Sequence, residues 1–223
     1  MNALADPIRV LAVDDHPLVR DGIAALLASV VDIALVGEAS DGIEAIEKYR
    51  QLRPDVTLMD LRMPSMGGID AILAIRREFG SARIVVLTTY QGDMLAQRAL
   101  RAGAQGYLLK GEVRRDLLEM IRAVHGGMRR IDVEVAQQLA EHTSEEPLSV
   151  RELKVLALVA RGNSNKRIAL QLAIAEGTVK SHMQHILSKL QASDRTHAVS
   201  VAIRRGIFEF DDSQSKGHDP WRL

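Results

Sequence analysis

Residues 56–64 read VTLMDLRMP, and this stretch says most about the fold of the chain. Its first four residues have the length and apolar character of a buried strand, which runs directly into the carboxylate of Asp60. Pro64 and the glycine pair after it keep the following loop from becoming helix. An acid that ends a parallel strand lies at the sheet edge where open α/β folds bind ligands. From this stretch alone, Asp60 is either a phosphoryl acceptor or the cap of the next helix.

Short apolar runs alternate with amphipathic helical patterns from residue 8 to residue 126. The predicted strands cover residues 10–13, 33–36, 56–59, 84–87 and 107–109, and the predicted helices cover residues 17–28, 42–50, 68–78, 93–102 and 114–125. Near-continuous apolar strands are typical of a parallel sheet that is covered on both faces. Five β/α repeats therefore predict a doubly wound α/β domain with a five-stranded parallel sheet.

The composition is that of an ordinary globular protein, with 47% hydrophobic and 26% charged residues among 223. No apolar run reaches the ~18 residues that a membrane span needs, and no signal-peptide pattern is present. The chain has no cysteine, which excludes disulfides and thiolate metal sites. We expect a cytoplasmic protein that has no membrane partner.

Charge is distributed unevenly along a chain whose formal net charge is +0. Residues 1–140 hold 17 Lys and Arg against 19 Asp and Glu, a net charge of −2. Residues 147–210 hold 10 against 4, a net charge of +6. This asymmetry indicates that the C-terminal part binds a polyanion.

Polar side chains follow four of the predicted strands. Asp14 and Asp15 come after the first strand, Asp60 after the third, Thr88 after the fourth and Lys110 after the fifth. In a parallel sheet these residues meet at one edge, where three carboxylates repel one another unless a cation lies among them. Oxygen ligands of this kind suit Mg²⁺, and a hydroxyl and an ammonium could bind phosphoryl oxygens. The pattern predicts phosphoryl transfer.

Each of these residues also has a purely structural interpretation. Asp14 and Asp15 could be N-caps of the helix that begins near Pro17. Thr88 could be an ordinary strand residue, and Lys110 a solvated charge at a strand end. We interpret His16 as a loop or capping residue.

Competing phosphate-binding motifs are not found in the sequence. There is no glycine-rich nucleotide fingerprint after the first strand and no G-x-x-x-x-G-K-[ST] motif. A haloacid-dehalogenase-type phosphatase would need an acid two residues after Asp60, where Arg62 stands.

The acidic pair at residues 14 and 15, the segment MDLRMP at residues 59–64, Thr88 and Lys110 together resemble the signature of two-component receiver domains. The resemblance covers residues 7–126 and implies that Asp60 is the phosphoacceptor, supplied by a cognate sensor histidine kinase. It also implies a Mg²⁺ site formed by Asp14, Asp15, Asp60 and the main-chain carbonyl of Arg62.

The same resemblance implies that Thr88 and Lys110 contact the phosphoryl group. Tyr107 matches the switch aromatic of the family, with a strand-packed aromatic as the alternative interpretation. Many receivers carry Pro after the lysine, whereas Gly111 follows Lys110 here. We expect a trans bond at this position, because a cis bond without Pro costs about 3–4 kcal/mol.

A linker is predicted at residues 127–146, with a helical apolar pattern at residues 131–139. Beyond it, Ser149 and Glu152 have the spacing of a capping box, and Gly162 is placed to end the helix that they open. Further helices are predicted at residues 165–172, 178–190 and 195–204. Four short helices at residues 147–210 predict a small all-α helix-turn-helix domain, and we expect the tail at 211–223 to be disordered.

The third of these helices is amphipathic. Its apolar stripe includes Val179, Met183 and Ile186, while the polar residues lie on another face. No acid occurs within residues 178–190. A helix free to enter a DNA major groove has this pattern, and a solvated face on a plain helical bundle is the alternative.

The segments LSVRE at 148–152, GNSNKRIA at 162–169 and GTVKSH at 177–182 resemble the LuxR-type DNA-binding domain, over residues 147–206. The positions that match the DNA contacts of the family are Lys180, Ser181 and Gln184, with Asn165, Lys166, Thr178 and Lys189 at phosphates. Ala175 replaces a capping Ser common in the family, a loss of about 1 kcal/mol unless Glu176 or Thr178 substitutes.

Together the two halves resemble a response regulator of the NarL/FixJ family. The resemblance implies phosphorylation-dependent binding to double-stranded DNA, a homodimer when active, and RNA polymerase as a candidate partner. It implies a signalling protein, not an enzyme. The alternative is a DNA-binding regulator that acts without phosphorylation and uses the receiver only for protein interaction.

Overall fold

The structure is a computed structural model that describes residues 6–89, 93–133, 135–137 and 146–207. The predicted disordered tail at residues 211–223 and the last part of the linker helix lie outside the described residues. The chain divides into two compact units: the first runs to Gln137 without Gly92–Leu95, and the second consists of Gly92–Leu95 and Gln138–Leu223. No helix among the described residues is both long and apolar enough to cross a bilayer.

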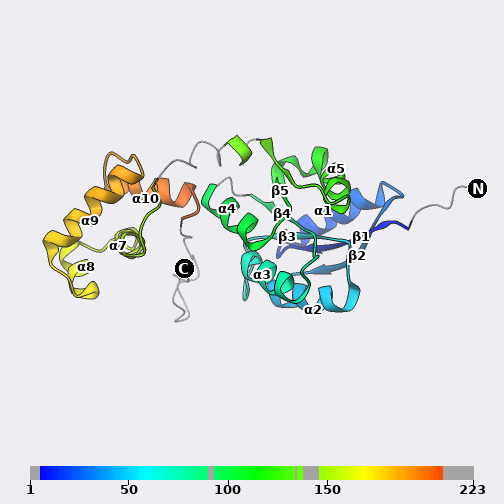
Figure 1. Ribbon diagram of the computed structural model, residues 1–223, viewed down its shortest axis with the longest axis horizontal. Coiled ribbons are helices and arrows are strands. Elements are labelled where there is room, and N and C mark those ends of the chain that lie inside the picture. Colours follow the sequence, from blue (N-terminus) through cyan, green and yellow to red (C-terminus); the bar gives the residue numbers. More distant parts are fainter. Residues whose placement is uncertain (1–5, 90–92, 134, 138–145, 208–223) are drawn as a thin grey trace, which may run out of the picture. The chain divides into compact units, whose positions relative to one another are not determined.

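The first unit is a parallel sheet with helices on both faces (Figure 1). Its strands are β1 (Ile8–Val13), β2 (Ile33–Ala39), β3 (Val56–Asp60), β4 (Ile84–Thr88), β5 (Gly106–Leu109) and β6 (Arg130–Ile131). Its helices are α1 (Pro17–Ala28), α2 (Gly42–Leu52), α3 (Gly68–Glu78), α4 (Asp93–Ala102), the 3₁₀ turn η1 (Lys110–Glu112) and α5 (Val113–His125). The strand order β2-β1-β3-β4-β5-β6 reverses direction at β1, so the doubly wound α/β prediction is confirmed.

The sheet has six strands where five were predicted. The sixth, β6, contains only Arg130 and Ile131, which pair with Gly106 and Tyr107 of β5. The main-chain amide of Asp132 donates to the carbonyl of Tyr107 at 3.0 Å. This strand joins the start of the predicted linker to the sheet, so the first unit extends past residue 126.

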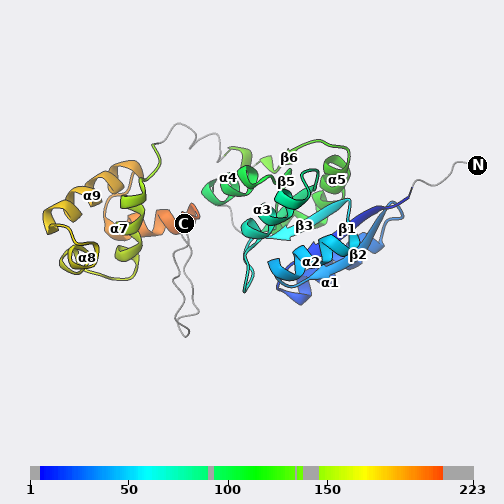
Figure 2. The same ribbon diagram turned by 60° about the horizontal axis from the view of Figure 1, so that its bottom comes forward.

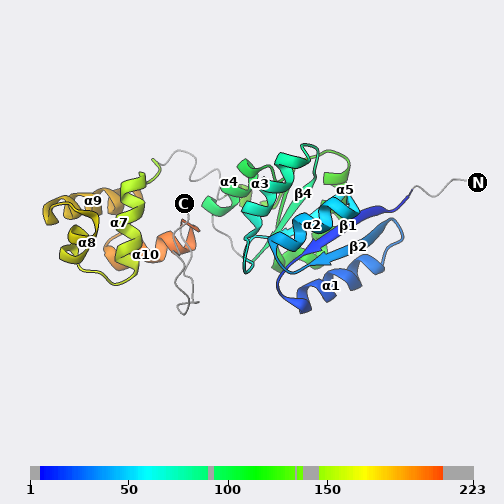
Figure 3. The same cartoon turned by 90° about the horizontal axis from the view of Figure 1, so that it is seen from below.

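Alternation along the central strands divides the core between the two faces of the sheet. Val10 and Ala12 of β1 pack in a cluster with Ile23 of α1 and Leu117 of α5. On the other face, α2 packs against α3, and Figure 3 shows α1 on the opposite side of the strands from these two helices. All five residues of β3 are buried, which explains why three of the four residues before Asp60 are apolar.

The second unit is a four-helix domain (Figure 2). Its helices are α7 (Val150–Ala160), α8 (Asn165–Leu172), α9 (Glu176–Lys189) and α10 (Arg195–Arg204). Ser149 and Glu152 form the predicted capping box, and Gly162, with φ of +76°, follows the C-cap of α7. Val155, Ile186 and Ala202 lie in the single core that α7, α9 and α10 share. The helix-turn-helix prediction is therefore confirmed.

Candidate functional site

Three acids converge at the carboxyl edge of the sheet. Neighbouring parallel strands deliver them, because β1 ends just before Asp14 and β3 ends at Asp60. Asp14 is 1% exposed and Asp60 is 4% exposed. One ligand atom from each of Asp14, Asp15, His16 and Asp60 lies within 4.8 Å of the others. The structure thus brings together the side chains predicted to hold a metal.

Lys110 lies among these acids. Its Nζ is 2.6 Å from Asp14 Oδ2 and 2.8 Å from Asp60 Oδ2, and its side chain is only 12% exposed. Burial opposes the charge of this ammonium, but the hydrogen bonds with Asp14 and Asp60 prevail and raise the pKa of Lys110. Lys110 is a charged member of the pocket and not a solvated strand end.

The pKa of the Asp60 carboxyl is raised above its ordinary value. Burial raises the pKa of its carboxyl, the bond from Lys110 opposes that rise, and the charge of Asp14 adds to it. Asp60 Oδ1 also accepts a hydrogen bond from the main-chain amide of Leu61 at 2.7 Å. The N-cap of α3 is Gly67, so Asp60 does not cap that helix.

The donor set suits a hard divalent cation. Three carboxylates with one lysine leave excess negative charge in a pocket that excludes much of the solvent. Carboxylate oxygens are the ligands that Mg²⁺ prefers, and such a site leaves room for phosphoryl oxygens and water. Arg62 stands two residues after Asp60 in the following loop, and its main-chain carbonyl as a ligand stays a prediction.

His16 belongs to the same cluster, although its sequence suggested only a loop or cap. It occupies the N-cap position of α1 and makes no side-chain cap bond, so Asp14 and Asp15 are not the caps of that helix. Its Nδ1 is 2.7 Å from Asp15 Oδ1. The His16 side chain is 67% exposed, whereas Asp14 of the same cluster is 1% exposed.

The other two predicted pocket residues lie on adjacent strands. Thr88 ends β4, is 1% exposed, and belongs to the strand that pairs with β3 beside Asp60. Tyr107 on β5 is fully buried. Burial and, after it, the charge of Asp60 raise the pKa of the Tyr107 hydroxyl. The phosphoryl-binding and switching roles of these residues stay predictions.

Gly68 is a site residue that the sequence marked only as a turn former. A Cβ at this position would lie 2.0 Å from the carbonyl oxygen of Asp60 and 2.9 Å from Cα of Leu61. The Gly68 amide also donates to the Leu61 carbonyl at 3.0 Å. The loop after the predicted phosphoacceptor can close in this way only around a residue without a side chain.

The peptide geometry after Lys110 agrees with the sequence prediction. The described residues contain no cis peptide bond, so the bond between Lys110 and Gly111 is trans.

In the second unit, α9 presents its predicted contact residues to solvent. Thr178, Lys180, Ser181 and Gln184 are exposed, whereas the apolar stripe of this helix is buried. The helix begins at Glu176, earlier than the predicted start at 178, so its first turn does contain an acid.

The start of α9 has no side-chain cap. Ala175 is the N-cap residue, and neither Glu176 nor Thr178 substitutes for the missing bond. Glu176 lies in the first turn of α9, where its negative charge interacts favourably with the helix dipole. Its Oε1 is 3.9 Å from Nζ of Lys180.

The remaining predicted contacts differ in environment. Lys166 on α8 is exposed and Asn165 is partly buried. Lys189 is only 15% exposed, and its Nζ lies 3.0 Å from Glu152 Oε2 and 3.0 Å from Glu146 Oε1. Glu152 in turn accepts the amide of Ser149 at 2.7 Å. Lys189 therefore joins the end of α9 to the start of α7.

Charge pairing around Lys189 is mutual. Burial raises the pKa of Glu152, but the bonds from the Ser149 amide and Lys189 outweigh it and leave that pKa below its ordinary value. Glu146 and then Glu152 raise the pKa of Lys189.

Comparison with protein families divides the chain in the same way as the structure. Residues 10–122 match the response regulator receiver domain, and residues 146–202 match the bacterial regulatory proteins of the luxR family. The transcriptional regulatory protein LiaR of Bacillus subtilis is 43% identical over 208 residues, which are 90% of this chain and 99% of LiaR. The response regulator VraR of Staphylococcus aureus is 38% identical over 207 residues, 91% of this chain and 99% of VraR.

Solved structures agree with this relationship. The response regulator RcsB of Salmonella typhimurium is similar with a TM-score of 0.70 at 28% identity, covering 86% of this chain and 98% of that one. An RcsB–DNA complex gives a TM-score of 0.69 at 27% identity, covering 89% of this chain and 99% of that one. The chain therefore belongs to the LuxR-type response regulators, which are two-component transcription regulators that bind DNA and not enzymes.

Proposed function

We propose that phosphorylation of Asp60 controls DNA binding by this regulator, with a sensor histidine kinase as the phosphoryl donor. The observation that carries the proposal is the buried Asp60 carboxylate, 2.8 Å from Lys110 and clustered with two further acids. An Asp60 oxygen attacks the phosphorus of the phosphohistidine, a P–O bond forms and the P–N bond breaks. The histidine of the kinase keeps the electron pair and takes up a proton.

Asp14, Asp15, Asp60 and the carbonyl of Arg62 would hold Mg²⁺, which supplies charge neutralisation at the phosphoryl oxygens. Lys110 donates a hydrogen bond to Asp60 Oδ2 at 2.8 Å and would bind an oxygen of the transferred group. Thr88, at the end of the neighbouring strand, would bind another. Movement of Thr88 toward the phosphoryl group would then change the packing around Tyr107 on the adjacent strand, which links the modification to the surface of the sheet.

The second unit would deliver the output. Lys180, Ser181 and Gln184 on the exposed face of α9 would meet base edges in the major groove, and Asn165, Lys166 and Thr178 would meet the phosphate backbone. The net charge of +6 over residues 147–210 supports a polyanionic partner. In an active homodimer, two such helices would bind half-sites about one DNA turn, ~34 Å, apart. We further propose that the protein acts in the cytoplasm and that RNA polymerase is one of its partners.

The test of the phosphoacceptor uses the full chain with acetyl phosphate and MgCl₂, followed by intact mass measurement. Wild type should gain the mass of one phosphoryl group, and Asp60→Ala should gain none. Asp70→Asn, at an exposed acid on α3, is the matched control and should be modified like wild type.

DNA binding is measured on the same samples. Phosphorylated wild type should bind promoter fragments more tightly than unmodified wild type, and Asp60→Ala should not respond to acetyl phosphate. Modification that persists in Asp60→Ala contradicts the acceptor assignment. Equal DNA binding with and without the phosphoryl group favours a regulator that acts independently of phosphorylation.

A further inference from the structure

No side-chain helix cap stabilises the turn that carries Asp14 and Asp15. Residues 14–16 connect β1 to α1, and the N-cap residue His16 makes no side-chain cap bond. The first turn of α1 contains no acid that could stabilise the helix start through its dipole. Within the connection, the His16 amide donates to Asp14 Oδ1 at 3.0 Å and His16 Nδ1 lies 2.7 Å from Asp15 Oδ1. These two contacts do not attach the connection to a neighbouring element.

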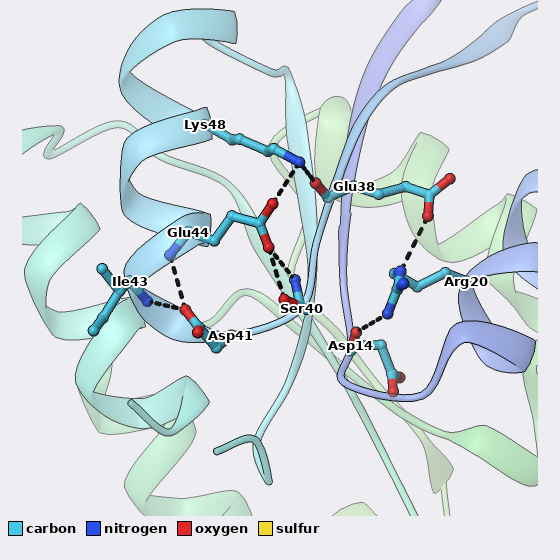
Figure 4. A network of polar contacts seen from close by, with 8 residues as sticks. All are labelled: Asp14, Arg20, Glu38, Ser40, Asp41, Ile43, Glu44 and Lys48. Atoms are coloured by element: carbon cyan, nitrogen blue, oxygen red, sulfur yellow. Dashed lines mark hydrogen bonds and ion pairs between the residues drawn. The ribbon is translucent and has the colours of Figure 1, made fainter. Parts of the chain in front are cut away.

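Arg20, in the second turn of α1, reaches back to this connection. Its Nη1 donates to the main-chain carbonyl of Asp14 at 2.6 Å, and its Nε donates to Glu38 Oε2 at 3.0 Å. The side chain is 18% exposed. Figure 4 shows the guanidinium between Asp14 and Glu38. A guanidinium is a planar fork of donors, so bonds on two of its nitrogens fix its orientation.

The far side of this fork is itself anchored. Lys48 of α2 donates to the main-chain carbonyl of Glu38 and forms an ion pair with Glu44 at 2.7 Å. Glu44 accepts the amide and the hydroxyl of Ser40 at 2.7 and 2.8 Å. Figure 4 shows how these contacts tie α2 to the end of β2. Arg20 therefore bonds to a strand end that α2 holds in place.

Both main-chain polar groups of Asp14 are consequently held. Its amide donates to the carbonyl of Ala39 at 3.0 Å, and its carbonyl accepts from Arg20. With the peptide groups on both sides oriented, the direction of its Cα–Cβ bond is set. Its carboxylate then meets Lys110 at 2.6 Å.

We propose that Arg20 is a positioning residue for the acidic pocket, which orients the Asp14-Asp15 turn so that its carboxylates converge with Asp60 on a divalent cation. This inference rests on the proposed function of that pocket. Arg20 has no bond to a carboxylate of the pocket and acts through the Asp14 carbonyl. Residues that orient ligands from outside the coordination shell commonly change metal affinity by 10–100-fold when they are removed.

The test is Mg²⁺ binding by the full chain, measured by calorimetric titration in the absence of phosphoryl donors. Arg20→Ala should raise the dissociation constant for Mg²⁺ by about 10-fold, which is the lower end of the range for residues outside the coordination shell. Arg20→Lys keeps the charge but cannot orient two bonds through one planar group, so its affinity should fall between those of wild type and Arg20→Ala. Arg50→Ala is the matched control, because Arg50 pairs with Glu78 on the surface at 2.9 and 3.1 Å and should leave Mg²⁺ affinity unchanged.

Thermal melting separates positioning from general stability. Loss of structure alone would lower the melting temperature equally with and without Mg²⁺, whereas loss of positioning reduces the increase that Mg²⁺ produces. If Arg20→Ala does not fold, Arg20→Lys and Glu38→Gln carry the comparison. Mg²⁺ affinity in these variants equal to that of wild type and Arg50→Ala overturns the inference. Absence of Mg²⁺ binding by wild type would instead refute the proposed function of the pocket.

Discussion

Two lysines of the DNA-binding unit should respond differently to substitution. The resemblance to the LuxR-type DNA-binding domain implies that both Lys166 and Lys189 contact DNA phosphates. In the structure Lys166 is exposed on α8, whereas the Lys189 ammonium is bonded to Glu152 and Glu146. We expect Lys166 to neutralise a phosphate, and Lys189 to stabilise the junction of α9 with α7.

The magnitude follows from counterion release. Each neutralised phosphate contributes about 0.9 to the slope of log affinity against log salt concentration on duplex DNA. Removing one such contact should therefore reduce the slope by about 0.9, which corresponds to about 3.5-fold in affinity for a fourfold change in salt. Lys166→Gln should show this reduction, and Lys189→Gln should keep the slope of wild type.

The assay is fluorescence anisotropy with a labelled duplex at a series of salt concentrations. Non-specific DNA suffices, because the slope reports phosphate contacts and not base recognition. Circular dichroism melts show that each variant is folded at the assay temperature. A slope reduction by Lys189→Gln as large as that of Lys166→Gln would refute the assignment of Lys189 to a structural role.

Two further predictions concern the receiver unit. Gly68→Ala places a methyl group 2.0 Å from the Asp60 carbonyl oxygen and should abolish phosphorylation by acetyl phosphate, whereas Gly80→Ala, with no atom within 4 Å of its Cβ, should be modified normally in the mass assay. Glu44 has a pKa lowered to about 2, chiefly by Lys48, so it contributes stability above its ordinary pKa of 4.5 that is lost as the pH falls toward 2. Urea midpoints should consequently decline less steeply over this pH range for Glu44→Gln, and an unchanged pH profile would contradict the pairing.

The strands of the receiver were predictable because each central strand is buried on both faces and reads as an apolar run. The single acid that ends β3 was therefore conspicuous in the sequence. By contrast, β6 was missed because two residues, Arg130 and Ile131, have no periodicity to detect. Their strand conformation depends on the free edge of β5, which exists only after the sheet has formed.

The helical unit shows the same division. The capping box at Ser149 and the glycine after α7 are local signals, so the bounds of α7 followed from them. The start of α9 at Glu176 was not predicted, because its N-cap residue Ala175 has no side chain that could form a capping bond. The ion pair of Lys189 was not predictable for a related reason, since its partner Glu152 is 37 residues away along the chain.

By itself the sequence determined the residue types at the strand ends, the charge difference between the halves and the acidic character of the pocket around Asp60. Only the tertiary structure decided that Lys110 lies between Asp14 and Asp60, that Gly68 contacts the Asp60 backbone, and that Arg20 holds the acidic turn. The physical reason is that hydrophobic burial and local hydrogen bonds leave a periodic trace in the sequence. The directions in which polar side chains meet across packed elements leave no such trace.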